Sequence, residues 1–260
     1  VHDSVLTAVA GGLAEILPDT PFYAFGRLDE AHARGAMEAL RALPGMLFGE
    51  PEFSVAALAR AVASGGDRAV PGSVMRTPTG LKVTPQGRVD LDRSPVPAWD
   101  LVDLRSYGFS PHQSPVELVY PVLMSRSCPF PCFYCEVRVR PPWISRSVDA
   151  VLEEMRLLHT RHGATTFFLA DPTFAVDRSL AMEFCRRLPS EGPPGARWTC
   201  MSRTDRVDEE LLRAMAAAGC FNILFGIESL NPEPLKRAAK NLDPATVKPA
   251  LDAARRAGIE

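Results

Sequence analysis

The chain has 260 residues, of which 46% are hydrophobic and 23% charged, and its formal net charge is −2. This balance predicts an ordinary buried core, and it provides no basic surface that would attract nucleic acid or an anionic membrane. No apolar run reaches the ~18 residues of a membrane span, and the first residues do not open a signal peptide. We therefore expect no nucleic-acid partner, no membrane span and a cytoplasmic location.

Residues 1–93 show the alternation of strands and helices that is typical of an α/β domain. Hydrophobic spacing and stop signals predict helices over residues 4–17, 31–43 and 53–64 and strands over 21–25 and 46–48. Two further short strands are expected between residues 74 and 89, joined in a hairpin-like connection. The alternation favours a parallel sheet covered by helices. Because so few strands are visible, we expect an incomplete, Rossmann-like domain.

Residues 94–117 are predicted to link this domain to a second one, since Pro95 and Pro97 favour an extended, stiff chain. From residue 118 onward the alternation is clearer, and it continues to residue 260. It predicts four strand–helix units, with strands over 118–124, 166–170, 198–201 and 221–227 and helices over 147–162, 177–188, 208–218 and 243–258. Units of this kind curl towards a barrel or form an open parallel sheet.

Three of the six cysteines, Cys128, Cys132 and Cys135, lie in one loop with the spacing C-x3-C-x2-C. In a chain without an export signal, such a group more often binds a metal or does chemistry than forms disulfides. Three thiolates can hold three irons of a 4Fe–4S cluster and leave the fourth iron open for another ligand. A zinc site is the alternative, and it needs a fourth ligand. The other three cysteines are isolated in the sequence, and we expect them to be small buried hydrophobic residues.

The cysteine loop, the apolar strand before it and the strand–helix units after it resemble the radical S-adenosylmethionine enzymes over residues 118–260. The resemblance implies a TIM-like partial (β/α)6 barrel, of which this chain has the first four units. Since the sequence stops where a fifth strand should begin, we expect it to be a fragment. The resemblance also implies that the open iron binds S-adenosylmethionine and that one electron from the cluster releases a 5′-deoxyadenosyl radical. An electron donor such as flavodoxin or ferredoxin and a small-molecule substrate are the implied partners.

The resemblance places four further residues in the expected cofactor site. Tyr134 is the aromatic residue directly before the last cysteine of the loop. Asp171 follows the second strand, where the family has a polar group facing the methionine end of the cofactor, unless it caps the turn that follows. Arg203 follows the third strand and is expected to pair with the cofactor carboxylate, unless it is paired within its own loop. Glu228 closes the fourth strand and is expected near the ribose or the amino group.

Residues 49–101 resemble the segment that joins a cobalamin-binding domain to such a barrel. This implies the subgroup that contains methylases of unactivated carbon and a tetrapyrrole ring-forming cyclase, so we expect methylation or carbon-skeleton chemistry. The Asp-x-His-x-x-Gly loop of that domain is not found, and residues 30–35 only imitate it with Glu30 in place of Asp. Cobalamin binding is therefore left open.

Two other functions stay open, and one position departs from the family pattern. A non-catalytic zinc- or iron–sulfur-binding module remains an alternative to the enzyme. A methylthiotransferase is the weaker alternative, because such an enzyme would carry a second cluster on an N-terminal cysteine domain and residues 1–127 contain no cysteine. Ser127 stands where the family commonly has a glycine before the first cysteine, and this small residue puts little in doubt.

Overall fold

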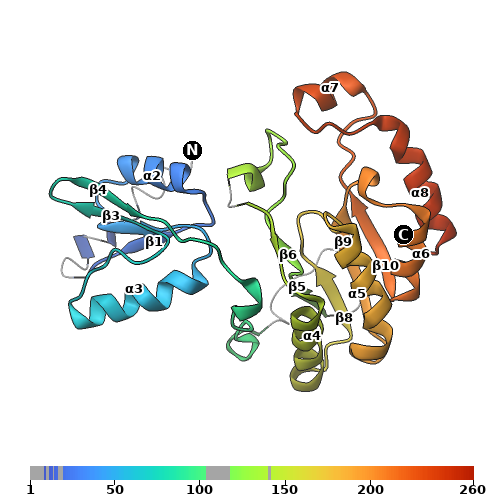
Figure 1. Cartoon of the computed structure of the whole chain (residues 1–260), viewed down its shortest axis with the longest axis horizontal. Coiled ribbons are helices and arrows are strands. Elements are labelled where there is room, and N and C mark those ends of the chain that lie inside the picture. Colours follow the sequence, from blue (N-terminus) through green and yellow to red (C-terminus); the bar gives the residue numbers. More distant parts are fainter. Residues whose placement is uncertain (1–8, 10–11, 14, 17–19, 104–117, 140–141) are drawn as a thin grey trace. The chain divides into compact units, whose positions relative to one another are not determined.

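The computed structural model describes residues 9, 12–13, 15–16, 20–103, 118–139 and 142–260, and Figure 1 shows it with its elements labelled. Apart from residues 139–141, the chain divides after Pro95 into two compact units, which are described here one at a time. The helix expected over residues 4–17 lies largely outside the described residues, and so does most of the linker expected over residues 94–117.

The first unit is a small mixed sheet with a helix on each face. Its elements are β1 (Tyr23–Phe25), α2 (Glu30–Ala39), β2 (Gly45–Leu47), α3 (Glu52–Ser64), β3 (Ser73–Thr77) and β4 (Gly80–Thr84). The strand order is β1-β2-β3-β4, with β1 and β2 parallel and the pairs β2/β3 and β3/β4 antiparallel. The expected strand–helix alternation is present. The sheet is nevertheless mixed, because the hairpin of β3 and β4 reverses the chain beside β2.

Alternating side chains of the central strands bind the two helices of this unit. Successive residues of a strand point to opposite faces of a sheet. Met46 and Val74 therefore pack with Met37 of α2, whereas their neighbours Leu47 and Met75 pack with the side chain of Leu58 on α3. Figure 1 shows α2 and α3 on opposite sides of the sheet.

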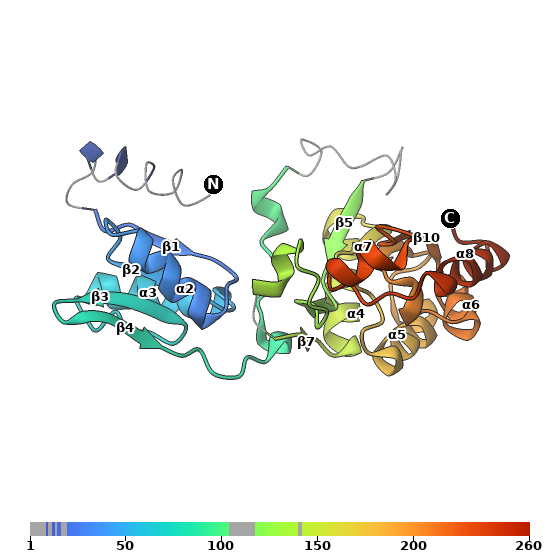
Figure 2. The same cartoon turned by 90° about the horizontal axis from the view of Figure 1, so that it is seen from above.

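The second unit contains the four strand–helix units predicted from residue 118 onward. Its main elements are β5 (Val119–Val122), α4 (Val148–His162), β8 (Thr166–Leu169), α5 (Arg178–Glu191), β9 (Arg197–Ser202), α6 (Glu209–Ala217), β10 (Cys220–Phe225), α7 (Pro232–Arg237) and α8 (Val247–Arg256). The strands form one parallel sheet in the order β10-β9-β8-β5. The prediction of an α/β fold with a parallel sheet is confirmed, and the curved sheet with its helices is seen in Figures 1 and 2.

Shorter elements connect the main ones. A two-residue ladder joins β6 (Ser125–Arg126) to β7 (Ile144–Ser145) on either side of the cysteine loop. Single 3₁₀ turns cover Leu91–Arg93, Trp99–Leu101, Glu136–Val139, Thr204–Arg206 and Pro244–Thr246. At the free edge of β10, the backbone of Glu260 donates to Phe221 and accepts from Ile223, with N···O distances of 3.0 and 2.9 Å.

The helix ends follow the capping signals in the sequence. Ser147 and Asp208 cap α4 and α6, since their side-chain oxygens accept hydrogen bonds from Ala150 N–H and Leu211 N–H. Gly163 ends α4 in the left-handed conformation with φ 67°. The short helix α7 was not predicted, although Asn231 followed by proline is a start signal for a helix.

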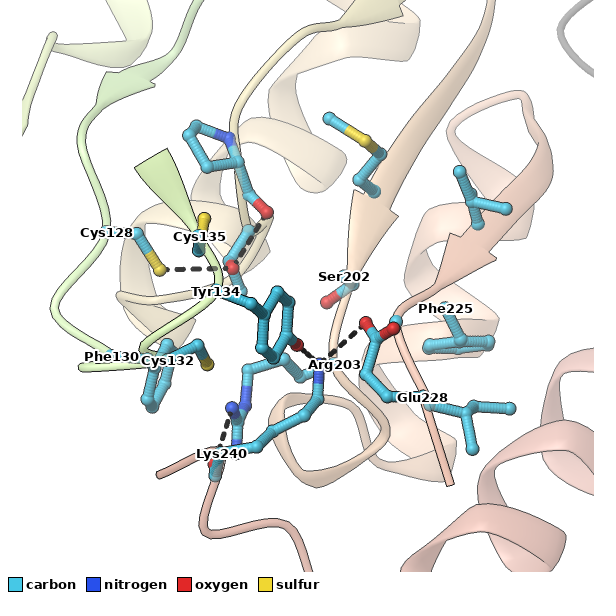
Figure 3. Close-up of a pocket in the computed structure, with 16 residues that line it drawn as sticks. Cys128, Phe130, Cys132, Tyr134, Cys135, Ser202, Arg203, Phe225, Glu228 and Lys240 are labelled. Carbon is cyan, nitrogen blue, oxygen red and sulfur yellow. Dashed lines mark hydrogen bonds and ion pairs between the residues drawn. The ribbon is translucent and has the colours of Figure 1, made fainter. Parts of the chain in front are cut away.

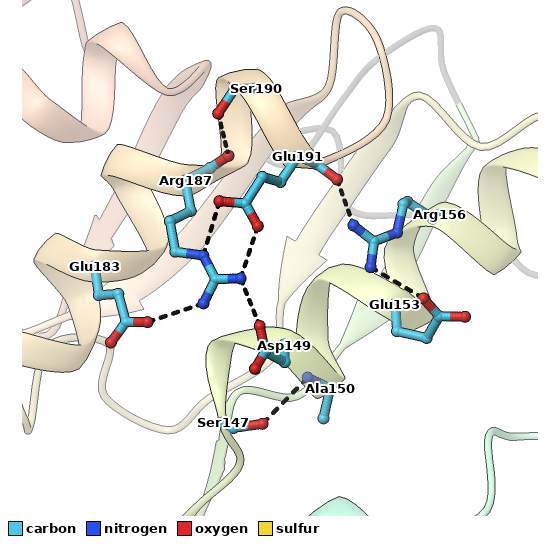
Figure 4. Close-up of polar contacts among 9 residues, drawn as sticks. All are labelled: Ser147, Asp149, Ala150, Glu153, Arg156, Glu183, Arg187, Ser190 and Glu191. Carbon is cyan, nitrogen blue, oxygen red and sulfur yellow. Dashed lines mark hydrogen bonds and ion pairs between the residues drawn. The ribbon is translucent and has the colours of Figure 1, made fainter.

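The outer helices α4 and α5 are joined by a surface ion-pair network (Figure 4). Arg187 of α5 contacts Glu183 and Glu191 on its own helix and reaches Asp149 in the first turn of α4. Hydrogen bonds from Arg187 lower the pKa of the Glu191 carboxyl. Among the described residues, no helix is both long and apolar enough to cross a membrane.

Candidate active site

A pocket of about 490 Å³ opens at the carboxyl ends of the parallel strands of the second unit. Polar and ligating groups often gather at this end of parallel sheets. The pocket is lined by the cysteine loop, by residues that follow β8, by the last residues of β9 and β10 and those after them, and by Lys240 after α7 (Figure 3). Its lining comprises Cys128, Phe130, Cys132, Tyr134, Cys135, Pro172, Thr173, Met201, Ser202, Arg203, Leu224, Phe225, Gly226, Ile227, Glu228 and Lys240.

The three thiols of the cysteine loop all face this pocket and none forms a disulfide. Cys132 is buried, whereas Cys128 and Cys135 are half-buried. The Cys128 thiol lies 3.5 Å from the hydroxyl of Thr173, and the backbone of the loop turns through a bond from Cys135 N–H to Cys132 C=O. Within the described ranges, no three His, Cys, Asp or Glu side chains converge on a point where one metal ion would sit. The loop thus presents separate soft ligands to a shared space.

An aromatic contact holds the cysteine loop against the end of β9. The ring of Phe130 lies under two guanidinium groups, with its centroid 4.0 Å from Cζ of Arg203 and 4.9 Å from Cζ of Arg206. Such cation–π contacts contribute about 0.5–2 kcal/mol each, with the larger values in desolvated surroundings. The loop backbone is fixed as well, since Phe133 N–H donates to Ala238 C=O over 3.0 Å.

Arg203 is 4% exposed, and its guanidinium is engaged on every side. Its Nε and Nη2 donate to the two carboxylate oxygens of Asp205 over 2.8 and 2.7 Å, and its Nη1 donates to Lys240 C=O over 3.0 Å. Burial disfavours the charge, yet the Asp205 carboxylate raises the pKa of Arg203 overall, so the guanidinium stays charged. We expected this fork to pair with a ligand carboxylate. The structure instead pairs it within its own loop, the alternative that the sequence left open.

Lys240 is a charged pocket residue that was not predicted from the sequence. Its ammonium lies 3.2 Å from the Glu228 carboxylate and 3.4 Å from the Tyr134 hydroxyl, and the residue is 5% exposed (Figure 3). Gly226 leaves the room for this contact, because a Cβ there would lie 3.1 Å from the Lys240 nitrogen. The backbone around Lys240 is tightly turned, with φ values of 51° at Ala239 and 50° at Asn241.

The Lys240 contact brings Tyr134 and Glu228 together, as expected for two residues of one site. Burial raises the pKa of Tyr134 above its usual range, and the neighbouring Glu228 and Cys132 raise it further, so the phenol stays protonated. The side chain of Glu228 is 46% exposed and therefore remains open to the pocket. Only the start signal of α7 could have pointed to Lys240, since the following turn returns the chain to the site.

Asp171 does not line the pocket, contrary to our expectation. It is 1% exposed, and its carboxylate accepts hydrogen bonds from Met124 N–H over 2.8 Å and from the Ser125 hydroxyl over 2.5 Å. Its position directly after β8 turns the side chain towards the end of β5, where it supports the first residues of the cysteine loop. Burial raises the pKa of Asp171 to about 6, and these hydrogen bonds oppose the rise.

The raised pKa of Asp171 predicts a pH-dependent term in stability. The folded state keeps this proton up to about pH 6, whereas the unfolded carboxyl loses it near pH 3.8. The term is therefore favourable below the unfolded pKa and is lost as the pH rises through the folded value, by roughly 3 kcal/mol in all. Chemical denaturation between pH 4 and 7 should show the wild type losing stability relative to Asp171→Asn over this range. A difference that is constant with pH would contradict the assignment.

The second unit matches a known protein family. The model of the radical SAM superfamily matches residues 122–260. An uncharacterized methyltransferase of Pyrococcus horikoshii is 30% identical over 172 residues, which are 65% of this chain and 36% of that protein. The anaerobic magnesium-protoporphyrin IX monomethyl ester cyclase of Synechocystis is 30% identical over 156 residues, or 59% of this chain and 30% of that protein. The chain thus spans about a third of the length of these curated relatives.

A solved structure agrees with the fold of the chain. The radical S-adenosylmethionine methyltransferase TsrM from Kitasatospora setae, with cobalamin and a [4Fe-4S] cluster bound, superposes with a TM-score of 0.68 at 19% identity. The match covers 96% of this chain and 53% of TsrM. The spacing of the three cysteines, the parallel sheet behind them and the match over residues 122–260 agree, and the chain belongs to the radical SAM superfamily.

Proposed function

We propose that this chain forms the cofactor-binding core of a radical S-adenosylmethionine enzyme that acts on a small molecule. The observation on which the proposal rests is that Cys128, Cys132 and Cys135 present three free thiols to one pocket at the carboxyl end of a parallel sheet. In this proposal a 4Fe–4S cluster binds to these three thiols, and S-adenosylmethionine binds in the same pocket.

The donor set fits a cluster better than a single ion. Iron–sulfur clusters are held by cysteine thiolates, each bound to its own iron, so the thiols need not converge on one point. The three thiols here do not converge, and the described residues offer no fourth ligand for a zinc ion. The cationic Arg203 lies near the side chains of Cys128 and Cys132. When bound, the reduced cluster supplies the electron that cleaves a carbon–sulfur bond of S-adenosylmethionine to give a 5′-deoxyadenosyl radical.

The other side of the pocket suits a zwitterionic ligand. The Lys240 ammonium is a donor for a carboxylate, and the half-exposed Glu228 carboxylate is an acceptor for an amine or a hydroxyl. The Tyr134 phenol links them and keeps its proton. Apolar side chains of β9 and β10, Met201 and Phe225 among them, line the remaining wall. In this proposal Lys240, Glu228 and Tyr134 orient S-adenosylmethionine, while Asp171 and Arg203 hold the walls in place.

The names of the relatives support methylation or carbon-skeleton chemistry as the reaction class. One relative is described as a methyltransferase and another as a cyclase, and TsrM is a methyltransferase. An electron donor such as flavodoxin or ferredoxin and a cytoplasmic location are parts of the proposal, as is the small-molecule substrate.

Cobalamin enters the proposal through TsrM, which was solved with cobalamin bound and which matches both units of this chain. The α/β fold of the first unit supports the proposal that this unit takes part in cobalamin binding. We assign no cobalamin ligand, because residues 30–35 belong to helix α2 and not to a loop. His32 lies at the exposed start of this helix, where its ring nitrogen is 2.8 Å from the carboxylate of Asp29, the N-cap residue. His32 is therefore explained by the cap of the helix.

The first prediction from this proposal concerns the thiols. Anaerobic reconstitution with iron and sulfide should load the wild-type chain with a reducible cluster, and dithionite with S-adenosylmethionine should then yield 5′-deoxyadenosine. Replacing Cys128, Cys132 or Cys135 by alanine should lower cluster content and turnover by about 100-fold or more. Mutating a residue that only supports a metal ligand already lowers metal affinity or activity by about 10–100-fold, and these variants lose a ligand itself.

Cys185→Ala is the matched control for these variants. Its thiol is buried among core side chains and its pKa is raised to about 12 by that burial, so it is inert. Iron and sulfide content should be unchanged in this variant. Tightly bound zinc in place of iron in the wild type, or three alanine variants that all keep the cluster, would contradict the proposal.

The second prediction concerns Lys240. Lys240→Met keeps much of the apolar stem but removes the ammonium, so the dissociation constant of S-adenosylmethionine should rise about tenfold or more, as expected for a lost charged hydrogen bond. Equilibrium binding to the loaded chain measures this. Lys248→Met is the control, because that side chain is 84% exposed on α8. Unchanged affinity in Lys240→Met would exclude the assigned contact, and unchanged cluster content separates it from damage to the loop.

A further inference from the structure

Ser127, the residue directly before the first cysteine of the loop, has an unusual backbone. Its φ is 66°, in the left-handed region that side chains with a Cβ rarely adopt outside Asn and Asp. The residue follows the two-residue strand β6 and is 1% exposed. A glycine would take this conformation without strain. The chain nevertheless places a serine here.

The hydroxyl of Ser127 is buried and has no hydrogen-bond partner among the described residues. The other fully buried serines of the described chain all donate. Ser125 donates to the Asp171 carboxylate, Ser202 to Phe174 C=O and Ser73 to Val70 C=O. Ser54, the remaining one, donates to Pro71 C=O. Among the buried serines of the described chain, Ser127 is thus the one whose hydroxyl has no partner; the half-buried Ser94 also has an unpaired hydroxyl.

Two unfavourable features thus meet in one residue. A buried hydroxyl without a partner loses its hydrogen bonds to water, and a serine at positive φ is strained. Glycine would remove both features, so neither serves the fold of the ligand-free chain. Outliers of this kind gather where a ligand supplies the missing partner.

We propose that the Ser127 hydroxyl is a positioning and tuning group that donates a hydrogen bond to a sulfur atom of the bound cluster or of its cysteine ligands. This inference rests on the proposed function. Ser127 does not line the pocket itself, but it is covalently adjacent to Cys128, whose side chain does. The cluster brings sulfur acceptors that the ligand-free loop does not provide within hydrogen-bond reach of this hydroxyl.

The hydrogen bond has a defined electronic consequence. Hydrogen bonds to cluster sulfurs are among the factors that set the reduction potential. A donor stabilises the form with more negative charge on sulfur, which is the reduced form. Ser127 therefore raises the midpoint potential of the cluster and makes it easier to reduce.

The test compares Ser127→Ala and Ser127→Gly with the wild type in the full chain, using two readouts. In the loaded chain, redox titration followed by electron paramagnetic resonance should show a more negative midpoint potential in both variants. In the ligand-free chain, chemical denaturation should show that neither variant is less stable than the wild type and that Ser127→Gly is the more stable of the two. Ser73→Ala removes a buried, bonded hydroxyl in the first unit, and it should lower stability and leave the potential unchanged.

The outcomes separate this inference from the proposed function. A wild-type chain that takes up no cluster overturns both. A loaded wild type whose midpoint potential equals that of the two Ser127 variants overturns the role of Ser127 alone. A loss of stability in ligand-free Ser127→Ala, with the potential unchanged, would show that a buried water serves the hydroxyl, and it would also overturn the inference.

Discussion

The buried guanidinium of Arg203 is the contact on which the shape of the pocket depends. It joins three segments that are far apart in sequence, since it bonds to Asp205 after β9, covers Phe130 of the cysteine loop and donates to the backbone of Lys240. A buried charge that loses its partners costs about 3–5 kcal/mol, so these segments are held together strongly. The positive charge also lies beside the thiols. One side chain thus fixes the walls of the site and sets its electrostatic character.

The two sides of the pocket divide the chemistry between them. The cysteine loop supplies soft, separate thiols, whereas the ends of β9 and β10 and the turn after α7 supply charges and hydrogen-bond donors. The turn that delivers Lys240 has positive φ at Ala239 and Asn241, and the cysteine loop has it at Ser127. Such a position costs about 1–2 kcal/mol for residues other than glycine, Asn and Asp, as at Ala239 and Ser127. The strain at these positions therefore lies around the pocket, where binding can offset it.

Much of the second unit could be predicted from the sequence because its signals are local. The caps Ser147 and Asp208, the stop at Gly163 and the apolar strands all lie where the pattern placed them. The cysteine loop was found by spacing alone. The first unit was harder, since nothing local shows that β3 enters its sheet antiparallel to β2.

The roles of single polar residues could not be predicted, because they depend on contacts between distant segments. Asp171 and Arg203 stand at strand ends as expected, but one supports the cysteine loop from behind and the other pairs with Asp205. Lys240 reaches the pocket only through a helix and a strained turn. Glu228 and Tyr134 face the pocket as expected, and what they bind there stays a prediction.

The proposed function requires that the three thiols leave one iron of the cluster open towards the pocket that would hold S-adenosylmethionine. Electron paramagnetic resonance of the reduced, reconstituted chain with and without S-adenosylmethionine tests this requirement. Binding at the open iron should change the g values of the cluster signal, and the change should saturate with ligand concentration. A cluster whose signal is the same at saturating S-adenosylmethionine would contradict the claim.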